Sequence, residues 1–178
     1  MNDHDEGNQD HLRKIIGAFN TGMLVTQLPN DSSRGRPMAI ARHGLASESR
    51  QDIDGLKANV LYFVTNRNAP KVSEIIADSR AVVTLQDSSH FVSLTGTVSV
   101  SEEKGLVARL WSAPLKIWFP SGQEDPNICV LTFSPHSAEY WDNSGTKGLH
   151  FLFDAVTAYV KGEKIKTGDA DSNGRVRL

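Results

Sequence analysis

Hydrophobic positions recur along this chain with two different periods. The apolar residues from Leu12 to Phe19 are spaced i, i+3, i+4 and i+7, as one face of an α-helix, and predict a first helix. Between residues 91 and 100, apolar side chains alternate with Ser and Thr, as in a strand with one buried and one wet face. The chain therefore combines short helices with β-strands.

Six apolar runs predict strands, at residues 23–26, 37–41, 60–65, 81–85, 91–100 and 128–133. Turn-forming residues at 29–33 and 87–89 join two pairs of these runs into hairpins, and Pro135 is expected to close the sixth strand. Gly96 interrupts the fifth run, and a strand position without a side chain often marks the close approach of a ligand or another backbone. Antiparallel hairpins separated by short helices favour a small barrel or half-barrel over a parallel sheet.

Three more helices are predicted between and after these strands. One begins near Pro70, which suits a first helical turn because it has no N–H group to leave unpaired, with Asn68 or Ala69 as the N-cap. Another follows Ser101, whose side chain is expected to cap it. The last is an amphipathic segment between residues 149 and 160.

The two ends of the chain differ from its middle. Residues 1–10 contain no large apolar side chain after Met1, and residues 162–178 are rich in Gly, Lys, Asp and Ser. Such segments bury too little apolar surface to offset the entropy of ordering, so we expect a flexible N-terminal segment and a disordered tail. The folded domain is predicted to span residues 11–161.

Composition narrows the class of protein. Nineteen Lys and Arg residues against 21 Asp and Glu residues give a net charge of −2, which argues against a nucleic-acid or anionic-membrane binder. The single cysteine, Cys129, excludes an intramolecular disulfide and a Cys-rich zinc site. No apolar stretch approaches the ~20 residues of a membrane span, and the acidic start is unlike a secretory leader, so we expect a cytoplasmic protein.

The common catalytic signatures are missing from the sequence. It contains no G-x-S-x-G, H-E-x-x-H or G-x-G-x-x-G pattern. Its six histidines include no i, i+4 pair, so a metal site is not expected. No residue stands out as a general acid or base.

Two cations stand at positions that suit an anion. Arg36 begins an apolar strand, and Lys71 follows a strand end, at Thr65 and Asn66, that leads into a helix start. Backbone N–H groups and the helix dipole attract anions at such a start, and a phosphate dianion needs several charge-assisted hydrogen bonds. Taken singly, each cation is more readily explained as a surface charge.

An aromatic loop is the third suggestive feature. Trp111, Trp118 and Phe119 bring more apolar area than a solvent-facing loop needs. These side chains are expected in the core, in a subunit contact or stacked on a ligand.

In their order and spacing, six motifs resemble the FMN-binding split barrels of the pyridoxamine 5′-phosphate oxidase-like superfamily, in particular its general stress protein branch. The motifs are Arg36-Pro37-Met38, residues 61–66 followed by Lys71, and residues 78–83, 92–98, 118–122 and 139–142. The resemblance covers residues 11–160. It implies a mainly β fold, a six-stranded antiparallel split barrel of Greek-key type with short peripheral helices. It also implies a homodimer with flavin at the interface.

The same resemblance implies roles for particular residues. Arg36 and Lys71 would hold the phosphate of FMN or FAD, and Thr65 and Asn66 would donate hydrogen bonds to the phosphate or the ribityl chain. The other implied contacts are the backbone of Met38, Ala39, Phe63 and Val64 beside the flavin ring, Trp118 and Phe119 from the partner subunit, and Ser93, with His90 and Phe91, from the fifth strand.

The chain departs from the oxidases of this superfamily at two places. Ala69-Pro70 stands where they carry a Ser-Arg pair, so one phosphate-binding cation is absent unless Arg67 replaces it. Their basic C-terminal segment, which holds pyridoxal phosphate, has no counterpart here, so pyridoxamine phosphate oxidation is not expected. The leading function is a flavin-dependent oxidoreductase. The alternatives are a non-catalytic protein that binds or stores flavin in stress, and a dimeric module with an empty cleft.

Overall fold

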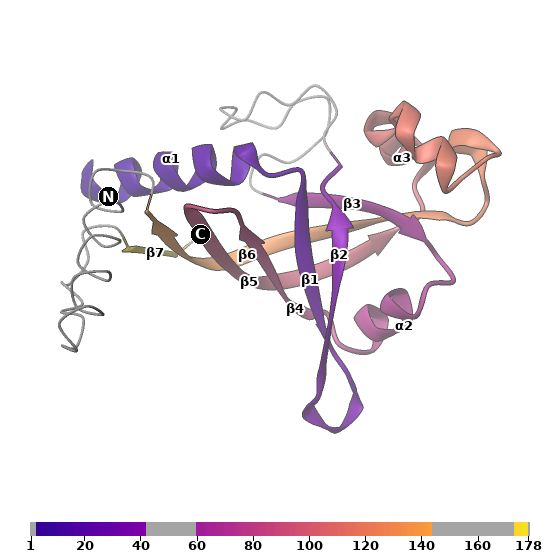
Figure 1. Ribbon diagram of the computed structural model, residues 1–178. Coiled ribbons are helices and arrows are strands. Elements are labelled where there is room, and N and C mark those ends of the chain that lie inside the picture. Colours follow the sequence, from indigo (N-terminus) through magenta and orange to yellow (C-terminus); the bar gives the residue numbers. More distant parts are fainter. Residues whose placement is uncertain (1–2, 42–59, 144–172, 178) are drawn as a thin grey trace, which may run out of the picture.

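The computed structural model describes residues 3–41, 60–143 and 173–177 (Figure 1). The amphipathic helix predicted between residues 149 and 160 lies outside these ranges. In the described part of the chain, no helix is both long and apolar enough to cross a membrane.

A curled antiparallel sheet forms the body of the fold, in the strand order β2-β1-β4-β5-β6-β3 (Figure 1). Its strands are β1 (Thr21–Gln27), β2 (Ser33–Ala39), β3 (Leu61–Asn66), β4 (Arg80–Gln86), β5 (His90–Ser101) and β6 (Ile128–Asp142). Just past the end of β2, an isolated bridge between Ala41 and Tyr62 of β3 brings the two edges of the sheet together. The predicted six-stranded half-barrel is therefore confirmed.

Within the described ranges, three α-helices accompany the sheet: α1 (Asp3–Ala18), α2 (Pro70–Ala77) and α3 (Lys104–Leu110). Short 3-10 turns lie at Pro29–Asp31, Ala113–Ile117 and Gly122–Glu124. The amphipathic helix predicted near residue 12 is confirmed, but it begins at Asp3, inside the segment expected to be flexible. The limits of the folded domain stay a prediction.

The two central helices differ in how well their starts were predicted. Helix α2 begins at Pro70 with Ala69 as its N-cap, as expected. The cap predicted for α3 is wrong, because Ser101 belongs to β5 and Glu103 is the N-cap. The Ser101 hydroxyl still accepts a hydrogen bond from the Glu103 N–H at 3.2 Å, just before the helix.

The prediction that Pro135 closes the sixth strand is wrong, since β6 continues to Asp142. Thr95 pairs with Ser137 and Gly96 with Pro135, which leaves one extra residue on β6 and makes a bulge. Proline is tolerated at a bulge because the ladder is locally broken there. A Cβ atom on Gly96 would lie 2.2 Å from the Ser134 carbonyl oxygen, so the missing side chain marks the approach of another backbone.

A seventh strand, β7 (Asn173–Arg177), pairs with β6 at residues 137–141, while β3 pairs with β6 at residues 128–133. The two strands thus share one edge of β6. Strand β7 falls within the tail expected to be disordered, so that expectation does not hold for residues 173–177. The physical reason is that the edge of β6 beyond β3 offers unpaired N–H and C=O groups, which the backbone of a polar segment can also pair with.

Two apolar cores occupy opposite sides of β3. The larger lies inside the curl of the sheet and includes the fully buried Phe63 and Phe133. The smaller packs α3 against the other side of β3, through Tyr62, and contains Phe119. Helix α2 covers one end of the larger core.

Candidate functional site

A cluster of polar and charged side chains fills the end of the larger core beneath α2. Thr26 is fully buried, at the position on β1 that follows the buried Gly22 and Leu24 on the same face. Arg36 lies opposite Leu24 in register and so projects from the same face of β2. We define the α2 cluster as Thr26, Arg34, Arg36, Thr65, Lys71 and Glu74.

Glu74 is the centre of this cluster, with a side chain only 9% exposed. Its Oε2 atom accepts hydrogen bonds from the Thr26 hydroxyl, at 2.6 Å, and from Arg36 Nη2. Its Oε1 atom accepts one from Arg34 Nη1 at 3.1 Å. Both carboxylate oxygens are therefore paired, and helix α2 is tied to the β1–β2 hairpin.

The environment of Glu74 favours its charged form. Burial by itself would raise the pKa of this carboxyl, but hydrogen bonds from Thr26 and Arg36 and the charges of both arginines outweigh it. The net result is a pKa below the ordinary value. Glu74 is thus an ionised carboxylate at neutral pH.

Arg36 is held on several sides, and its side chain is 15% exposed. Besides its pairing with Glu74, Nη1 donates to the Thr26 hydroxyl at 2.6 Å and to the Leu24 carbonyl at 3.4 Å. The interpretation of Arg36 as a surface charge is therefore wrong. It is a largely buried, oriented guanidinium.

Lys71 reaches the same cluster from the first turn of α2. Its Nζ atom donates to the Thr65 hydroxyl at 3.0 Å, and Thr65 is itself buried. Partial burial lowers the pKa of Lys71, and the charge of Arg36 lowers it further. The two cations that the sequence suggested as an anion site therefore share one electrostatic environment.

The turn between β3 and α2 directs its polar side chains elsewhere. Asn66 is exposed, and its Oδ1 atom accepts a hydrogen bond from the Asn68 N–H at 2.8 Å. Arg67 forms an ion pair with Glu102 at 2.9 Å. In this structure Arg67 does not supply the cation that is missing at Ala69-Pro70. The N–H of Val72 is also paired, to the Ala69 carbonyl at 2.8 Å.

The backbone candidates beside the flavin ring belong to the two outermost strands. Met38 and Ala39 lie in β2, and Phe63 and Val64 lie in β3, close to the bridge that joins these strands. The side chains of Met38 and Phe63 are buried in the larger core. Next to the bridge between the two strands, these residues can therefore present only their backbone to a ligand.

The two aromatic candidates have opposite surroundings. Trp118 is 77% exposed, at the end of a 3-10 turn, whereas Phe119 is 4% exposed and packs in the smaller core. A role for the Phe119 side chain in covering a partner's flavin is not supported, because that ring is already packed within its own chain. Trp118 does present its ring to the outside.

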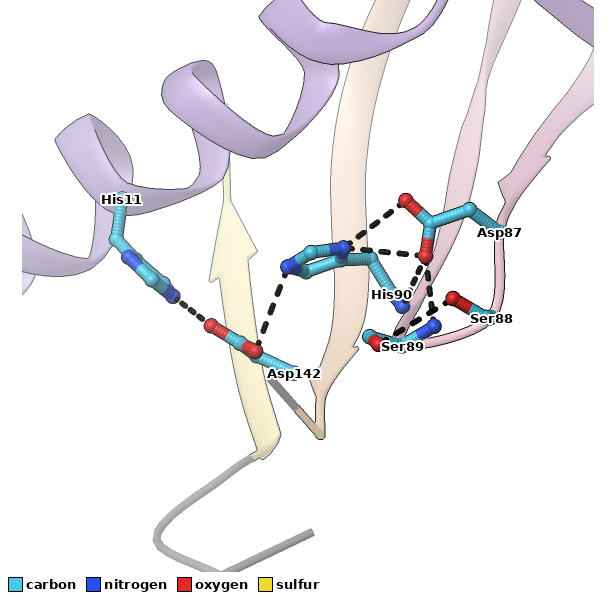
Figure 2. Close-up of polar contacts among 6 residues, drawn as sticks. All are labelled: His11, Asp87, Ser88, Ser89, His90 and Asp142. Carbon is cyan, nitrogen blue, oxygen red and sulfur yellow. Dashed lines mark hydrogen bonds and ion pairs between the residues drawn. The ribbon is translucent and has the colours of Figure 1, made fainter. Parts of the chain in front are cut away.

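The candidates on β5 lie away from the α2 cluster. Ser93 alternates with the buried Val92 and Leu94, so it faces outward, whereas Arg36 faces the core. Figure 2 shows that His90 belongs to a separate group near α1, which we call the histidine cluster: His11, Asp87, His90 and Asp142. The structure thus brings together Arg36, Thr65 and Lys71, but not Ser93 or His90.

The histidine cluster joins α1 to the strand ends through Asp142. One carboxylate oxygen of Asp142 lies 2.8 Å from His11 Nε2, and the other lies 3.5 Å from His90 Nε2 (Figure 2). The N–H groups of Ser89 and His90 hold the pKa of Asp87 at about 2. The described residues contain no set of three or more ligands that could hold a metal ion.

Cys129 pairs in register with Thr65 and is fully buried. Burial raises the pKa of its thiol to about 11, and the negative charge of Glu102 acts in the same direction. This sulfur is a packing group with no reactive thiolate at neutral pH, as the sequence suggested.

Sequence reasoning missed Glu74, Thr26 and Arg34. One signal was available for Glu74, since it follows Lys71 by three positions on a predicted helix and so lies on the same helical face. Thr26 carried no such signal, because a threonine in an apolar strand is typical of β-structure. Only the tertiary fold shows that its hydroxyl is hydrogen-bonded to both Arg36 and Glu74.

A comparison with known protein families shows to which of them this chain belongs. The sequence profile described as "Pyridoxamine 5'-phosphate oxidase like" matches residues 7–166, which is nearly the whole chain. The chain belongs to the pyridoxamine 5′-phosphate oxidase-like family. A search of the curated proteins found no match.

Solved structures of general stress proteins share the fold of this family member. A protein of Jannaschia sp. CCS1 assigned to general stress protein 26 is 21% identical, with a TM-score of 0.66 over 98% of this chain and 99% of that one. General stress protein 26 from Bacillus anthracis is 25% identical, with a TM-score of 0.59 over 73% and 93%. The general stress FMN/FAD binding protein from Xanthomonas citri is 20% identical, with a TM-score of 0.62 over 79% and 92%.

Proposed function

We propose that this protein binds FMN, with the flavin phosphate held at the α2 cluster, and that it is a stress-type flavin-dependent oxidoreductase. The observation that carries the proposal is the convergence of Arg36 and Lys71, from separate elements, on one buried cluster. Membership of the pyridoxamine 5′-phosphate oxidase-like family and the likeness to an FMN/FAD binding protein support it.

The donors in the cluster suit a phosphate group. Among the described residues, the Lys71 ammonium donates one hydrogen bond, to Thr65, and so has two further N–H groups to offer. Arg36 keeps its Nε–H and one Nη2–H beyond its contacts with Thr26, Leu24 and Glu74. Charge-assisted hydrogen bonds of this kind are what a phosphate monoester requires.

When bound, the flavin supplies the redox chemistry, and the protein supplies orientation and electrostatics. Arg36 and Lys71 would anchor the phosphate end. The backbone of β2 and β3 beside the bridge at Ala41 would border the ring and keep water from one side of it. The exposed Trp118 of a partner subunit would cover the other side.

The first experiment is an absorption spectrum of the purified protein, followed by titration with FMN, FAD and riboflavin. We expect Arg36→Ala and Lys71→Ala each to weaken FMN binding by about 1.5–3 kcal/mol, the value of one charged hydrogen bond. The binding of riboflavin, which lacks the phosphate, should weaken little in these variants. Arg80→Ala, at an exposed arginine paired with Asp78, is the matched control. FMN affinity unchanged in both cluster variants would contradict the phosphate assignment.

The oxidoreductase is distinguished from the alternative, a flavin-storage protein, by rapid mixing with NADH and NADPH. Bleaching of the bound flavin by either donor supports the oxidoreductase. A flavin that stays oxidised with both donors supports storage. A colourless protein that takes up no flavin would leave only the empty-cleft module.

We also propose that the protein is a homodimer. Met23, Phe91 and Trp141 are exposed, and they alternate with buried neighbours on their strands, so they lie on the outward face of the sheet. Phe91 and Trp141 are opposite one another in register. Exposed, adjacent aromatic side chains such as Phe91 and Trp141 are typical of a subunit contact. Trp141→Glu should dissociate the dimer in sedimentation, whereas Ile76→Glu, at an exposed position on α2, should not.

A further inference from the structure

The α2 cluster contains an anion of its own. Glu74 pairs with Arg34 and Arg36, the second of which is also expected to bind a phosphate group. Its carboxylate is largely buried, and both of its oxygens are occupied. A site built to attract a negative ligand therefore carries a permanent negative charge at its centre.

The repulsion between the cations of the cluster explains why a negative group is needed there when no ligand is bound. Arg36 and Lys71 are like charges in a partly buried place, and the charge of Arg36 disfavours the charged form of Lys71. Glu74 offsets part of this repulsion, and three cations with one carboxylate leave a net charge of two positive. A phosphate monoester carries about −1.5 to −2 at pH 7, which matches that balance.

We propose that Glu74 is the resident counter-anion of the flavin-phosphate site. It holds Arg36 and Arg34 in place when no flavin is bound, and its charge opposes the phosphate when flavin is bound. Glu74 therefore limits the affinity for phosphorylated flavins and keeps the cofactor exchangeable. It acts as a positioning residue through the two arginines. This inference rests on the proposed function, since it assigns a role to Glu74 within that site.

A purely structural ion pair would behave differently. Losing such a pair loosens the site and weakens the binding of FMN and of riboflavin alike. Losing a counter-anion lowers the stability of the ligand-free protein but strengthens the attraction of the site for the phosphate. The ratio of FMN affinity to riboflavin affinity distinguishes these two cases, because the two ligands differ only in the phosphate.

The experiment compares wild type, Glu74→Gln and the control Asp78→Asn, which removes a carboxylate from an exposed arginine pair just after the same helix. For Glu74→Gln we expect a lower unfolding temperature without ligand and an FMN-to-riboflavin affinity ratio raised roughly 3- to 10-fold, the effect of one charge at close range. Asp78→Asn should leave the ratio unchanged. A ratio that stays the same or falls in Glu74→Gln would overturn the inference.

Inorganic phosphate provides the second readout. Millimolar phosphate should raise the unfolding temperature of Glu74→Gln more than that of wild type, because it replaces the missing anion. If Glu74→Gln does not fold alone, phosphate or FMN should restore its near-ultraviolet circular dichroism, and failure to do so overturns the inference. If wild type binds neither flavin, the proposed function fails, but the phosphate comparison still decides the role of Glu74.

Discussion

The α2 cluster and the histidine cluster each tie a helix to the sheet through one carboxylate, but their burial differs. Glu74 and Arg36 are largely enclosed, whereas His11 is 47% exposed beside Asp142. Figure 2 shows the second group lying across the strand ends near α1, and Figure 1 shows α2 toward the other end of the sheet. The α2 cluster, which is built on arginines and a lysine, is thus the drier of the two. The histidine cluster is the wetter one, because among its side chains only that of Asp142, at 16% exposed, is nearly as buried as that of Arg36.

The difference shows which charges need an explanation. An exposed pair gains little and costs little, so its presence says little about function. A buried network loses several kcal/mol of hydration per ion, and apolar side chains of similar volume would often be as stable. The proposed binding of a phosphate group would explain why the α2 cluster carries buried charges that stability alone does not require.

The largest expected effect follows from removing one partner in the dry cluster. Arg36→Met leaves the Glu74 carboxylate buried with Arg34 as its remaining cation, and should lower the free energy of unfolding by about 3–5 kcal/mol. Urea denaturation of the flavin-free protein measures this loss. Arg80→Met removes an arginine from an exposed pair and should change the stability little. Equal losses in both variants would remove the distinction between the two environments.

A second test asks whether solvent reaches the strand beside the cluster. The pKa of Cys129 lies at about 11 instead of its ordinary 9.0, so the thiolate fraction at pH 8 is lower by roughly 100-fold. Labelling by iodoacetamide should be slower than that of a free thiol by at least this factor, and urea should abolish the difference. Fast labelling of the native protein would show that the α2 end of the sheet is wet.

The pH dependence of stability tests the contribution of Glu74. The pKa of Glu74 in the folded protein is below its ordinary value of 4.5, so its contribution is complete above pH 4.5. That contribution is lost as the pH falls through the lowered value. Urea denaturation at pH 7 should therefore show a larger gap between wild type and Glu74→Gln than at the lowest pH where both fold. A gap that widens on acidification would contradict the sign.

The smallest effect is expected at the wet cluster. His11→Ala removes a contact between α1 and Asp142, and should lower the stability by less than about 1 kcal/mol. A loss comparable to that of Arg36→Met would mean that exposure is a poor guide to the importance of these groups.

Sequence alone predicted the six strands of the curled sheet, the two hairpins and the position of α2, because each depends on local periodicity and turn residues. It did not predict β7, and it placed the second strand at residues 37–41 instead of Ser33–Ala39. It also singled out Arg36 and Lys71, whose sequence contexts are distinctive. It could not predict that Thr26 and Glu74 join them, since that contact depends on how β1, β2 and α2 pack. The course of β6 past Pro135 was missed for a similar reason, because the bulge exists only in pairing with β5.

Gly96 has a consequence for how the two halves of the molecule are related. Gly96 lies opposite the bulge on β6. On one side of this bulge, residues 128–133 pair with β3, which leads to the α2 cluster. On the other side, residues 137–142 end at Asp142, in the histidine cluster. A methyl group at residue 96 would collide with the Ser134 carbonyl and push the strands apart at that seam. The absent side chain at Gly96 thereby allows β5 and β6 to stay paired across the bulge that lies between the two clusters.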